Sequence, residues 1–185
     1  MALTHTPLVD ESFRCPDFKL KAVDGKTYSN PDFQGSKFLA VVFMCNHCPY
    51  VKAIEDRLIQ VAKDIRELGG SFVGISSNDS EKYPEDSFEN LQKRWRDKSY
   101  DFPYLFDETQ SVAKAFDAVC TPDFFVFDAK GFLKYRGRLD DSWKEPELVT
   151  KRELLEACRA IANGKSVPDQ TPSMGCSIKW RSNKI

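Results

Sequence analysis

Two cysteines, Cys45 and Cys48, are separated by Asn46 and His47 and followed by Pro49. An apolar run precedes them and a segment with helical spacing follows, so we expect the pair where a strand passes into a helix. A helix N-terminus carries partial positive charge and unpaired N–H groups, which stabilise a thiolate and lower the pKa of a cysteine. A C-x-x-C motif at such a junction predicts a redox-active dithiol.

The histidine between the two cysteines strengthens this prediction. A partly charged imidazole at His47 would stabilise the thiolate, and stabilising the reduced form raises the reduction potential of the pair. The alternative is that His47 is an ordinary surface residue. A zinc site at Cys45 and Cys48 is a further alternative, but the chain has no second C-x-x-C motif and its only other histidine is His5.

A second candidate site lies much later in the chain, at Cys120, Thr121 and Pro122. A proline is tolerated at the first position of a strand, and the strand expected over residues 123–128 starts directly after this one. We expect the bond before Pro122 to be cis and the backbone of Thr121 to face an incoming peptide; a trans proline that starts the strand is the alternative. Cys120 and Cys176 are candidate auxiliary thiols, with purely structural roles as the alternative.

Hydrophobic spacing and turn residues predict the order of the elements. Asp107 with Gln110 and Thr150 with Glu153 resemble capping boxes and would start the last two helices. The order fits an α/β thioredoxin-like fold with an added N-terminal hairpin, and the apolar tail should pack on the body. The expected elements are a hairpin over 17–28, strands over 38–43 and 71–76, helices over 51–68, 88–95 and 107–116, a hairpin over 123–136 and a helix over 150–162.

Length and charge limit the class of protein. The chain has 185 residues and a formal net charge of −1, which suits one domain and argues against a nucleic-acid partner. We expect a thioredoxin-like domain over residues 1–165 and a tail over 166–185. The N-terminus resembles no signal peptide and the longest apolar run is far too short to span a bilayer, so we expect a cytoplasmic protein without a membrane partner. Six cysteines in a reducing compartment favour catalysis over a disulfide scaffold.

The sequence resembles the peroxiredoxin-like, C-x-x-C-containing branch of the thioredoxin superfamily, the redoxin or alkyl-hydroperoxide-reductase/thiol-specific-antioxidant type of domain. The resemblance implies a thioredoxin fold, with Cys45 and Cys48 as the redox pair and Pro122 as the cis-proline. The matching stretches span nearly the whole chain. They include Pro16-Asp-Phe18, Cys45-Asn-His-Cys-Pro-Tyr-Val51, Phe102-Pro-Tyr-Leu-Phe-Asp107, Cys120-Thr-Pro-Asp-Phe-Phe125 and Gly175-Cys-Ser-Ile-Lys-Trp180.

The chain departs from both relatives of this branch at defined positions. Thioredoxins carry a buried acid six residues before the first cysteine, where this chain has Leu39. Peroxiredoxins use Pro-x-x-x-Thr-x-x-Cys; with Cys48 as the last residue of that motif, the chain has Val41 and Cys45 in place of the proline and the threonine. Pro49, in contrast, follows Cys48 as a proline follows the peroxidatic cysteine.

Three functions remain open at this point. The first is a thiol–disulfide oxidoreductase in which Cys45 attacks a protein or small-molecule disulfide, Cys48 resolves the intermediate, and a thioredoxin- or glutathione-type donor recycles the pair. The second is a thiol peroxidase with Cys48 as the peroxidatic cysteine. The third is a non-enzymatic copper- or metal-binding module built from Cys45, Cys48, His47 and His5. The leading reading needs no cofactor or resident metal.

Overall fold

The computed structural model describes residues 3–182. The described chain alternates strands and helices, with short 3-10 turns between some of them. The strands are β1 (Leu3–His5), β2 (Lys19–Ala22), β3 (Thr27–Ser29), β4 (Phe38–Phe43), β5 (Ser71–Ser76), β6 (Tyr104–Phe106), β7 (Cys120–Thr121), β8 (Asp123–Asp128), β9 (Leu133–Tyr135) and β10 (Met174–Ser177). The helices are α1 (Pro49–Glu67), α2 (Phe88–Asp97), α3 (Ser111–Ala115) and α4 (Glu153–Ala162), and the 3-10 turns are η1 (Asn30–Phe33), η2 (Pro84–Asp86) and η3 (Pro146–Leu148).

A seven-stranded sheet in the order β3-β2-β6-β5-β4-β8-β9 forms the centre of the molecule. Strand β4 lies in its interior, parallel to β5 and antiparallel to β8. Its sequence is a continuous apolar run because both faces of the strand are covered. This mixed sheet with flanking helices is the predicted thioredoxin-like fold, and the β2–β3 hairpin is the predicted N-terminal addition.

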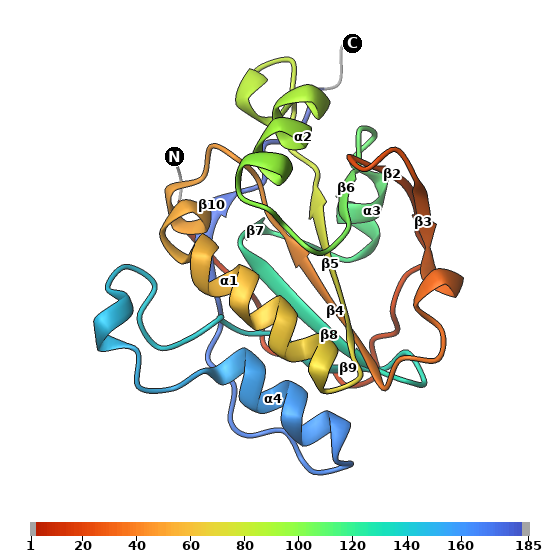
Figure 1. Ribbon diagram of the computed structural model, residues 1–185, viewed down its shortest axis with the longest axis vertical. Coiled ribbons are helices and arrows are strands. Elements are labelled where there is room, and N and C mark those ends of the chain that lie inside the picture. Colours follow the sequence, from red (N-terminus) through yellow and green to blue (C-terminus); the bar gives the residue numbers. More distant parts are fainter. Residues whose placement is uncertain (1–2, 183–185) are drawn as a thin grey trace.

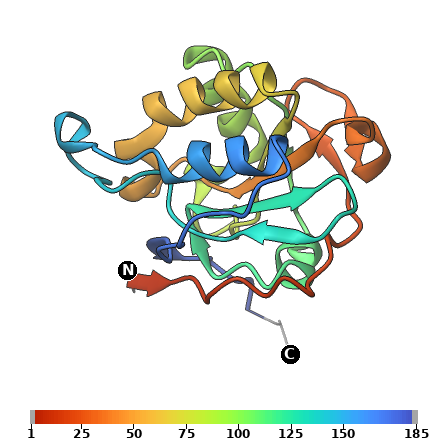
Figure 2. The same ribbon diagram turned by 90° about the horizontal axis from the view of Figure 1, so that it is seen from below.

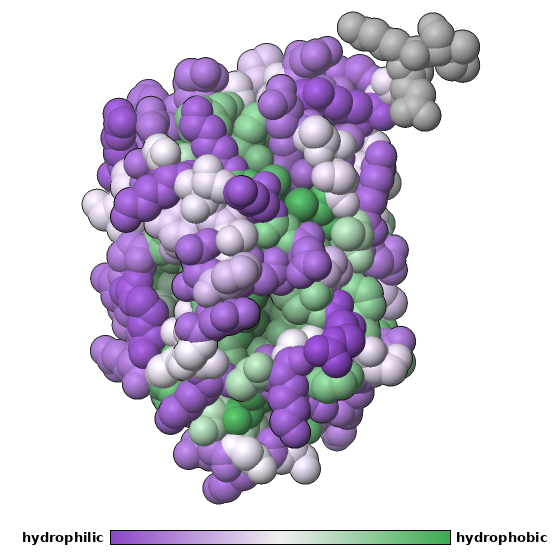
Figure 3. Space-filling view, turned by 90° about the vertical axis from the view of Figure 1, so that its right-hand side faces the viewer, coloured by the Kyte–Doolittle hydropathy of each residue, from purple (hydrophilic) through white to green (hydrophobic). Residues whose placement is uncertain are grey.

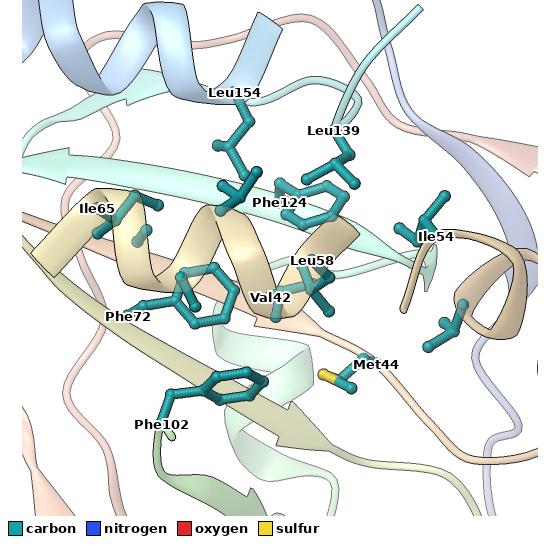
Figure 4. Close-up of a cluster of buried hydrophobic side chains, with 14 of the residues drawn as sticks. Val42, Met44, Ile54, Leu58, Ile65, Phe72, Phe102, Phe124, Leu139 and Leu154 are labelled. Carbon is teal, nitrogen blue, oxygen red and sulfur yellow. The ribbon is translucent and has the colours of Figure 1, made fainter. Parts of the chain in front are cut away.

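Helices cover both faces of the sheet. In Figures 1 and 2, α1, α2 and α4 lie on one face and α3 lies on the other. Helix α1 buries one apolar stripe, as the spacing of its hydrophobic residues predicts. Figure 4 shows Leu58 of α1 beside Val42 of β4 and below Phe124 of β8; Leu154 of α4 belongs to the same buried cluster. These contacts fix α1, and with it the start of the helix, against the central strands.

The C-terminal tail returns to the body, as predicted, and it does so as a strand. Strand β10 lies between β1 and β7 in a second sheet of three strands, with Cys176 opposite Thr121. In Figure 2, β1 and β10 lie on the side of the molecule away from α1 and α4. Gly175 makes the approach possible, because a Cβ atom at this position would lie 2.1 Å from the carbonyl oxygen of Thr121.

The two predicted capping boxes are wrong. Helix α3 begins at Ser111 rather than Asp107, since Gln110 adopts a left-handed backbone conformation with φ of 63°. The Asp107 side chain still serves the helix, because it accepts the N–H group of Ala113 at 2.9 Å. The structure therefore uses the acid as a cap from four residues upstream.

At the last helix, Thr150 is occupied elsewhere. Its hydroxyl and its N–H group both bind the carboxylate of Asp141. Helix α4 accordingly begins at Glu153, with Arg152 as its N-cap residue. The sequence pattern correctly predicted a helix here, but Thr150 does not cap it because Thr150 binds Asp141 instead.

Hydrophilic side chains cover most of the face seen in Figure 3, with apolar residues visible in a hollow near its middle. No helix within residues 3–182 is long and apolar enough to cross a membrane.

The close approach at Gly175 gives a first prediction. Gly175→Ala should lower the free energy of unfolding by about 1–3 kcal/mol, since the added methyl group overpacks a contact made with backbone atoms. Chemical denaturation of the reduced protein measures this. Ser177→Ala, at the end of the same strand, should change stability by less than about 0.5 kcal/mol; equal effects of the two substitutions would contradict the packing argument.

Candidate redox site

The cysteine pair lies between the end of β4 and the start of α1. Cys48 is the N-cap residue of α1, with extended backbone angles, and Pro49 occupies the first helical position. The proline has no N–H group to leave unsatisfied there, and its ring favours the extended conformation of the residue before it. Both cysteines are buried, with 1% and 0% of Cys45 and Cys48 exposed. They are present as a reduced dithiol.

The second predicted site lies directly against this pair. The bond between Thr121 and Pro122 is cis. The hydroxyl group of Thr121 is 3.4 Å from the sulfur of Cys45, and its carbonyl oxygen is 3.1 Å from the sulfur of Cys48. The structure thus brings together two segments more than seventy residues apart in the sequence.

The two sulfurs differ in their electrostatic surroundings. The hydrogen bond from the Cys45 thiol, together with N–H groups of Val51 and Cys176, lowers the pKa of Cys48 to about 5 despite burial. Burial raises the pKa of Cys45, and the nearby Cys48 and Asp86 add to this effect. These surroundings favour the thiolate form of Cys48, the sulfur at the helix start, and the thiol form of Cys45.

His47 is held by a buried carboxylate. Its Nδ1 atom lies 2.6 Å from Oδ2 of Asp86 and 3.8 Å from the sulfur of Cys45. Tyr83 stacks on the imidazole at a ring distance of 4.9 Å. His47 is thus not an ordinary surface residue: it is an oriented ring that lies between the first sulfur and Asp86.

Asp86 organises the C-x-x-C loop and was missed in the sequence. Burial alone would raise its pKa, but hydrogen bonds from His47, Asn78 and the backbone of Asn46 hold the pKa below its usual value. An acid just before a helix has the same pattern as any first-turn acid, so the sequence carried no signal for this role. Asn78, two residues after β5, carried only a weak signal for a site in the sequence, namely its place beyond the C-terminal end of that strand.

A cavity of about 340 Å³ opens beside the cis-proline. Pro122, Tyr50 and Trp143 contribute to a mainly apolar lining. Since Tyr50 is in the first turn of α1 and Pro122 follows Thr121, the cavity adjoins the cysteine pair. His5, considered as a metal ligand in the third function, lies in β1 and lines this cavity.

The remaining candidate thiols have different surroundings. Cys120 is buried, its sulfur is 3.5 Å from the carbonyl oxygen of Pro122, and burial raises its pKa. Cys176 lies on β10, where burial and the neighbouring Cys48 raise its pKa to about 11. Cys158 is a core residue of α4. Cys176 alone among these contacts the sulfur of Cys48.

One group of side chains in the described part of the chain could hold a metal ion. Ligand atoms of Cys45, His47 and Asp86 lie within 4.8 Å of one another. Thiolate and imidazole donors suit zinc or copper, and copper(I) favours sulfur over carboxylate. The third residue of this group is Asp86, and His5, which the sequence offered for a metal site, is not part of it.

Residues 13–136 match the AhpC/TSA family. An uncharacterized conserved protein from Geobacillus kaustophilus is 43% identical, with 99% of this chain and 98% of that one covered and a TM-score of 0.91. A hypothetical protein from Sinorhizobium meliloti is 37% identical over 98% of each chain, with a TM-score of 0.87. A thiol:disulfide interchange protein of the thioredoxin family from Chlorobium tepidum shares the fold at 24% identity, 66% and 83% coverage and a TM-score of 0.56. No curated protein sequence matches the chain.

The fold is that of thioredoxin-like proteins. Within that class, the chain belongs to the AhpC/TSA family.

Removing the hydrogen-bond donor at position 45 tests the charge on Cys48. Cys45→Ala should raise the pKa of Cys48 from about 5 toward the ordinary value of about 8.5, and Cys45→Ser should raise it less, because a hydroxyl group can still donate. Thiolate absorbance of the reduced protein against pH measures the midpoint. The absorbance change of Cys48 can be separated from that of the remaining thiols because burial raises the pKa of the other four cysteines, Cys15, Cys120, Cys158 and Cys176. An unchanged midpoint in Cys45→Ala would refute the assignment.

Asp86 gives a second prediction for the site. Asp86→Ala should lower the free energy of unfolding by about 3 kcal/mol, because it leaves the buried donors of Asn46, His47 and Asn78 without a hydrogen-bond acceptor. Glu85→Ala is the matched control, because the side chain of Glu85, next to Asp86 in the sequence, is 67% exposed and its removal should change the free energy of unfolding little. Urea unfolding of both variants measures the difference; a loss below about 1 kcal/mol for Asp86→Ala would show that the carboxylate does not organise the loop.

Proposed function

We propose that the protein is a thiol–disulfide oxidoreductase that uses Cys45 and Cys48 as its redox pair. The observation that carries the proposal is the placement of two buried cysteines at the start of α1, with both sulfurs against the residue before the cis-proline; this setting lowers the pKa of Cys48. A thiolate is the reactive form in disulfide exchange, and stabilising it makes the corresponding disulfide more oxidising. Family membership supports redox chemistry in general.

The proposed cycle assigns different steps to the two cysteines. When a disulfide approaches, Cys45 passes its proton to the Cys48 thiolate and attacks one substrate sulfur. The other substrate sulfur leaves as a thiolate and takes up a proton, giving a mixed disulfide with Cys45. Cys48 then loses its proton and attacks Cys45, which releases the second substrate thiol and forms the Cys45–Cys48 disulfide.

Three neighbours support these steps. The Thr121 hydroxyl, 3.4 Å from Cys45, can donate to that sulfur once it is ionised. Its carbonyl oxygen, 3.1 Å from Cys48, can accept the thiol proton when Cys48 is protonated. His47, oriented by Asp86, faces the sulfur of Cys45 rather than that of Cys48.

The surroundings suggest how substrate and donor would meet the pair. The apolar cavity beside Pro122 would receive the apolar part of a disulfide substrate. Recycling would fall to a thioredoxin- or glutathione-type donor, and our proposal places the protein in the cytoplasm, where such donors keep thiols reduced.

Disulfide reduction by the intact protein tests this function. Cys45→Ser and Cys48→Ser should each lower the rate of reduction of a small disulfide by at least about 100-fold, because each removes one partner of the exchange. Cys15→Ser is the control, since Cys15 is a half-buried thiol whose burial raises its pKa to about 12. Equal activity of all three variants and the parent would overturn the proposal.

A thiol peroxidase is the second candidate, because the low pKa belongs to Cys48, which is followed by Pro49 at the helix start. In that reaction the Cys48 thiolate attacks a hydroperoxide, releases an alcohol and becomes a sulfenic acid, which condenses with Cys45 and releases water. Rapid peroxide consumption that is lost in Cys48→Ser and stalls after one turnover in Cys45→Ser would favour this candidate. Disulfide reduction without peroxide consumption would exclude it.

A further inference from the structure

Strand β10 lies along β7, the short strand that ends directly before the cis-proline. It pairs antiparallel with β7, with Cys176 opposite Thr121 and Ser177 opposite Cys120. On its other side it pairs with β1 over three residues. The backbone of Thr121, which the sequence suggested would face an incoming peptide, therefore faces a strand of the same chain.

This placement is built into the packing rather than a loose contact. Gly175 lies so close to Thr121 that no side chain fits between them. The hydroxyl group of Ser173 donates to the carbonyl oxygen of Pro122 at 2.9 Å, and the N–H group of Ile178 donates to the carbonyl oxygen of Val119 at 3.1 Å. Hydrogen bonds on both sides of Cys176 thus hold this residue at the site.

Cys48 is the sulfur that connects the other two. Its sulfur lies 3.1 Å from the carbonyl oxygen of Thr121, the residue opposite Cys176 in the pairing of β7 with β10, and all three cysteines belong to one buried cluster. Contacts with Cys45 on one side and Cys176 on the other affect the pKa of Cys48. Cys176 is 3% exposed, so bulk solvent does not compete for this contact. A thiol presented on an extended strand against the redox pair has the geometry of a bound substrate cysteine.

We propose that Cys176 is a third redox thiol, which exchanges with the Cys45–Cys48 disulfide to form a Cys48–Cys176 disulfide. This inference rests on the proposed function, because it needs the first disulfide to form. It also implies that β10 takes the place of a peptide at β7, so that the external substrate is a small disulfide rather than an extended polypeptide.

The exchange is balanced without any further oxidant. The Cys176 sulfur loses its proton and attacks the sulfur of Cys48, the Cys45–Cys48 bond breaks, and Cys45 leaves as a thiolate that takes up a proton. Oxidation of the pair favours the attack, because it removes the Cys48 charge that raises the pKa of Cys176 in the reduced protein. Lys179, three residues along, favours the ionised form of Cys176.

Peptide mapping after oxidation tests the proposal directly. Tryptic cleavage places Cys45 and Cys48 together on residues 38–52, Cys176 on 166–179 and Cys120 on 115–130. The wild-type protein is treated with one equivalent of diamide, blocked with a thiol alkylator and digested. We expect two products, the internal disulfide of 38–52 and a crosslink between 38–52 and 166–179, in a ratio that does not change on tenfold dilution.

Two variants sharpen the result. Cys45→Ser should convert nearly all oxidised protein to the crosslink between 38–52 and 166–179, and adding Cys176→Ser should abolish it. Cys120→Ser is the matched control and should leave the crosslink in place, because the Cys120 sulfur is directed to the carbonyl oxygen of Pro122.

The two levels of the account fail in different ways. A wild-type protein that forms the internal disulfide of 38–52, with Cys176 fully alkylated in both the wild type and Cys45→Ser, overturns the role of Cys176 alone. A crosslink to 115–130 in its place also overturns it. A wild-type protein that forms neither disulfide overturns the proposed function as well.

Discussion

The structure depends on one electrostatic arrangement: a buried sulfur at the N-terminus of α1 whose surroundings favour its ionised form. A charge removed from water is costly unless it is paired or hydrogen-bonded. Cys48 meets this requirement through the helix start, the Cys45 thiol and an N–H group of β10. These donors come from different parts of the chain. The packing of α1, the C-x-x-C loop and β10 together therefore stabilises the Cys48 sulfur.

Two other constraints follow from this arrangement. The cis-proline segment must approach both sulfurs, so that Thr121 contacts the pair with its side chain and carbonyl group and pairs with β10 through its strand. The C-terminal strand must then cross Thr121 at very short range, which glycine at position 175 allows without overpacking. Asp86 plays the corresponding role on the other side of the pair, where it fixes the loop that carries His47.

Much of the fold could be predicted because its signals are local. The apolar run of β4, the helical spacing of α1 and the Ala129-Lys-Gly131 turn between β8 and β9 each determine their element within a few residues. The starts of α3 and α4 could not be predicted, because the left-handed conformation of Gln110 delays the start of α3 and because Thr150 is bound by Asp141. The site divides in the same way. Cys45, Cys48 and Pro122 carry motif and turn signals, whereas Asp86 acts through contacts forty residues away in the sequence.

The account's central claim concerns where the negative charge lies in the reduced pair. The most direct measurement is a pH titration of the reduced protein labelled with ¹³C at the cysteine Cβ atoms, followed residue by residue by NMR. The account predicts that Cys48 titrates near pH 5 and that Cys45 remains protonated through neutral pH. Titration of both cysteines together near the ordinary value of about 8.5 would contradict it.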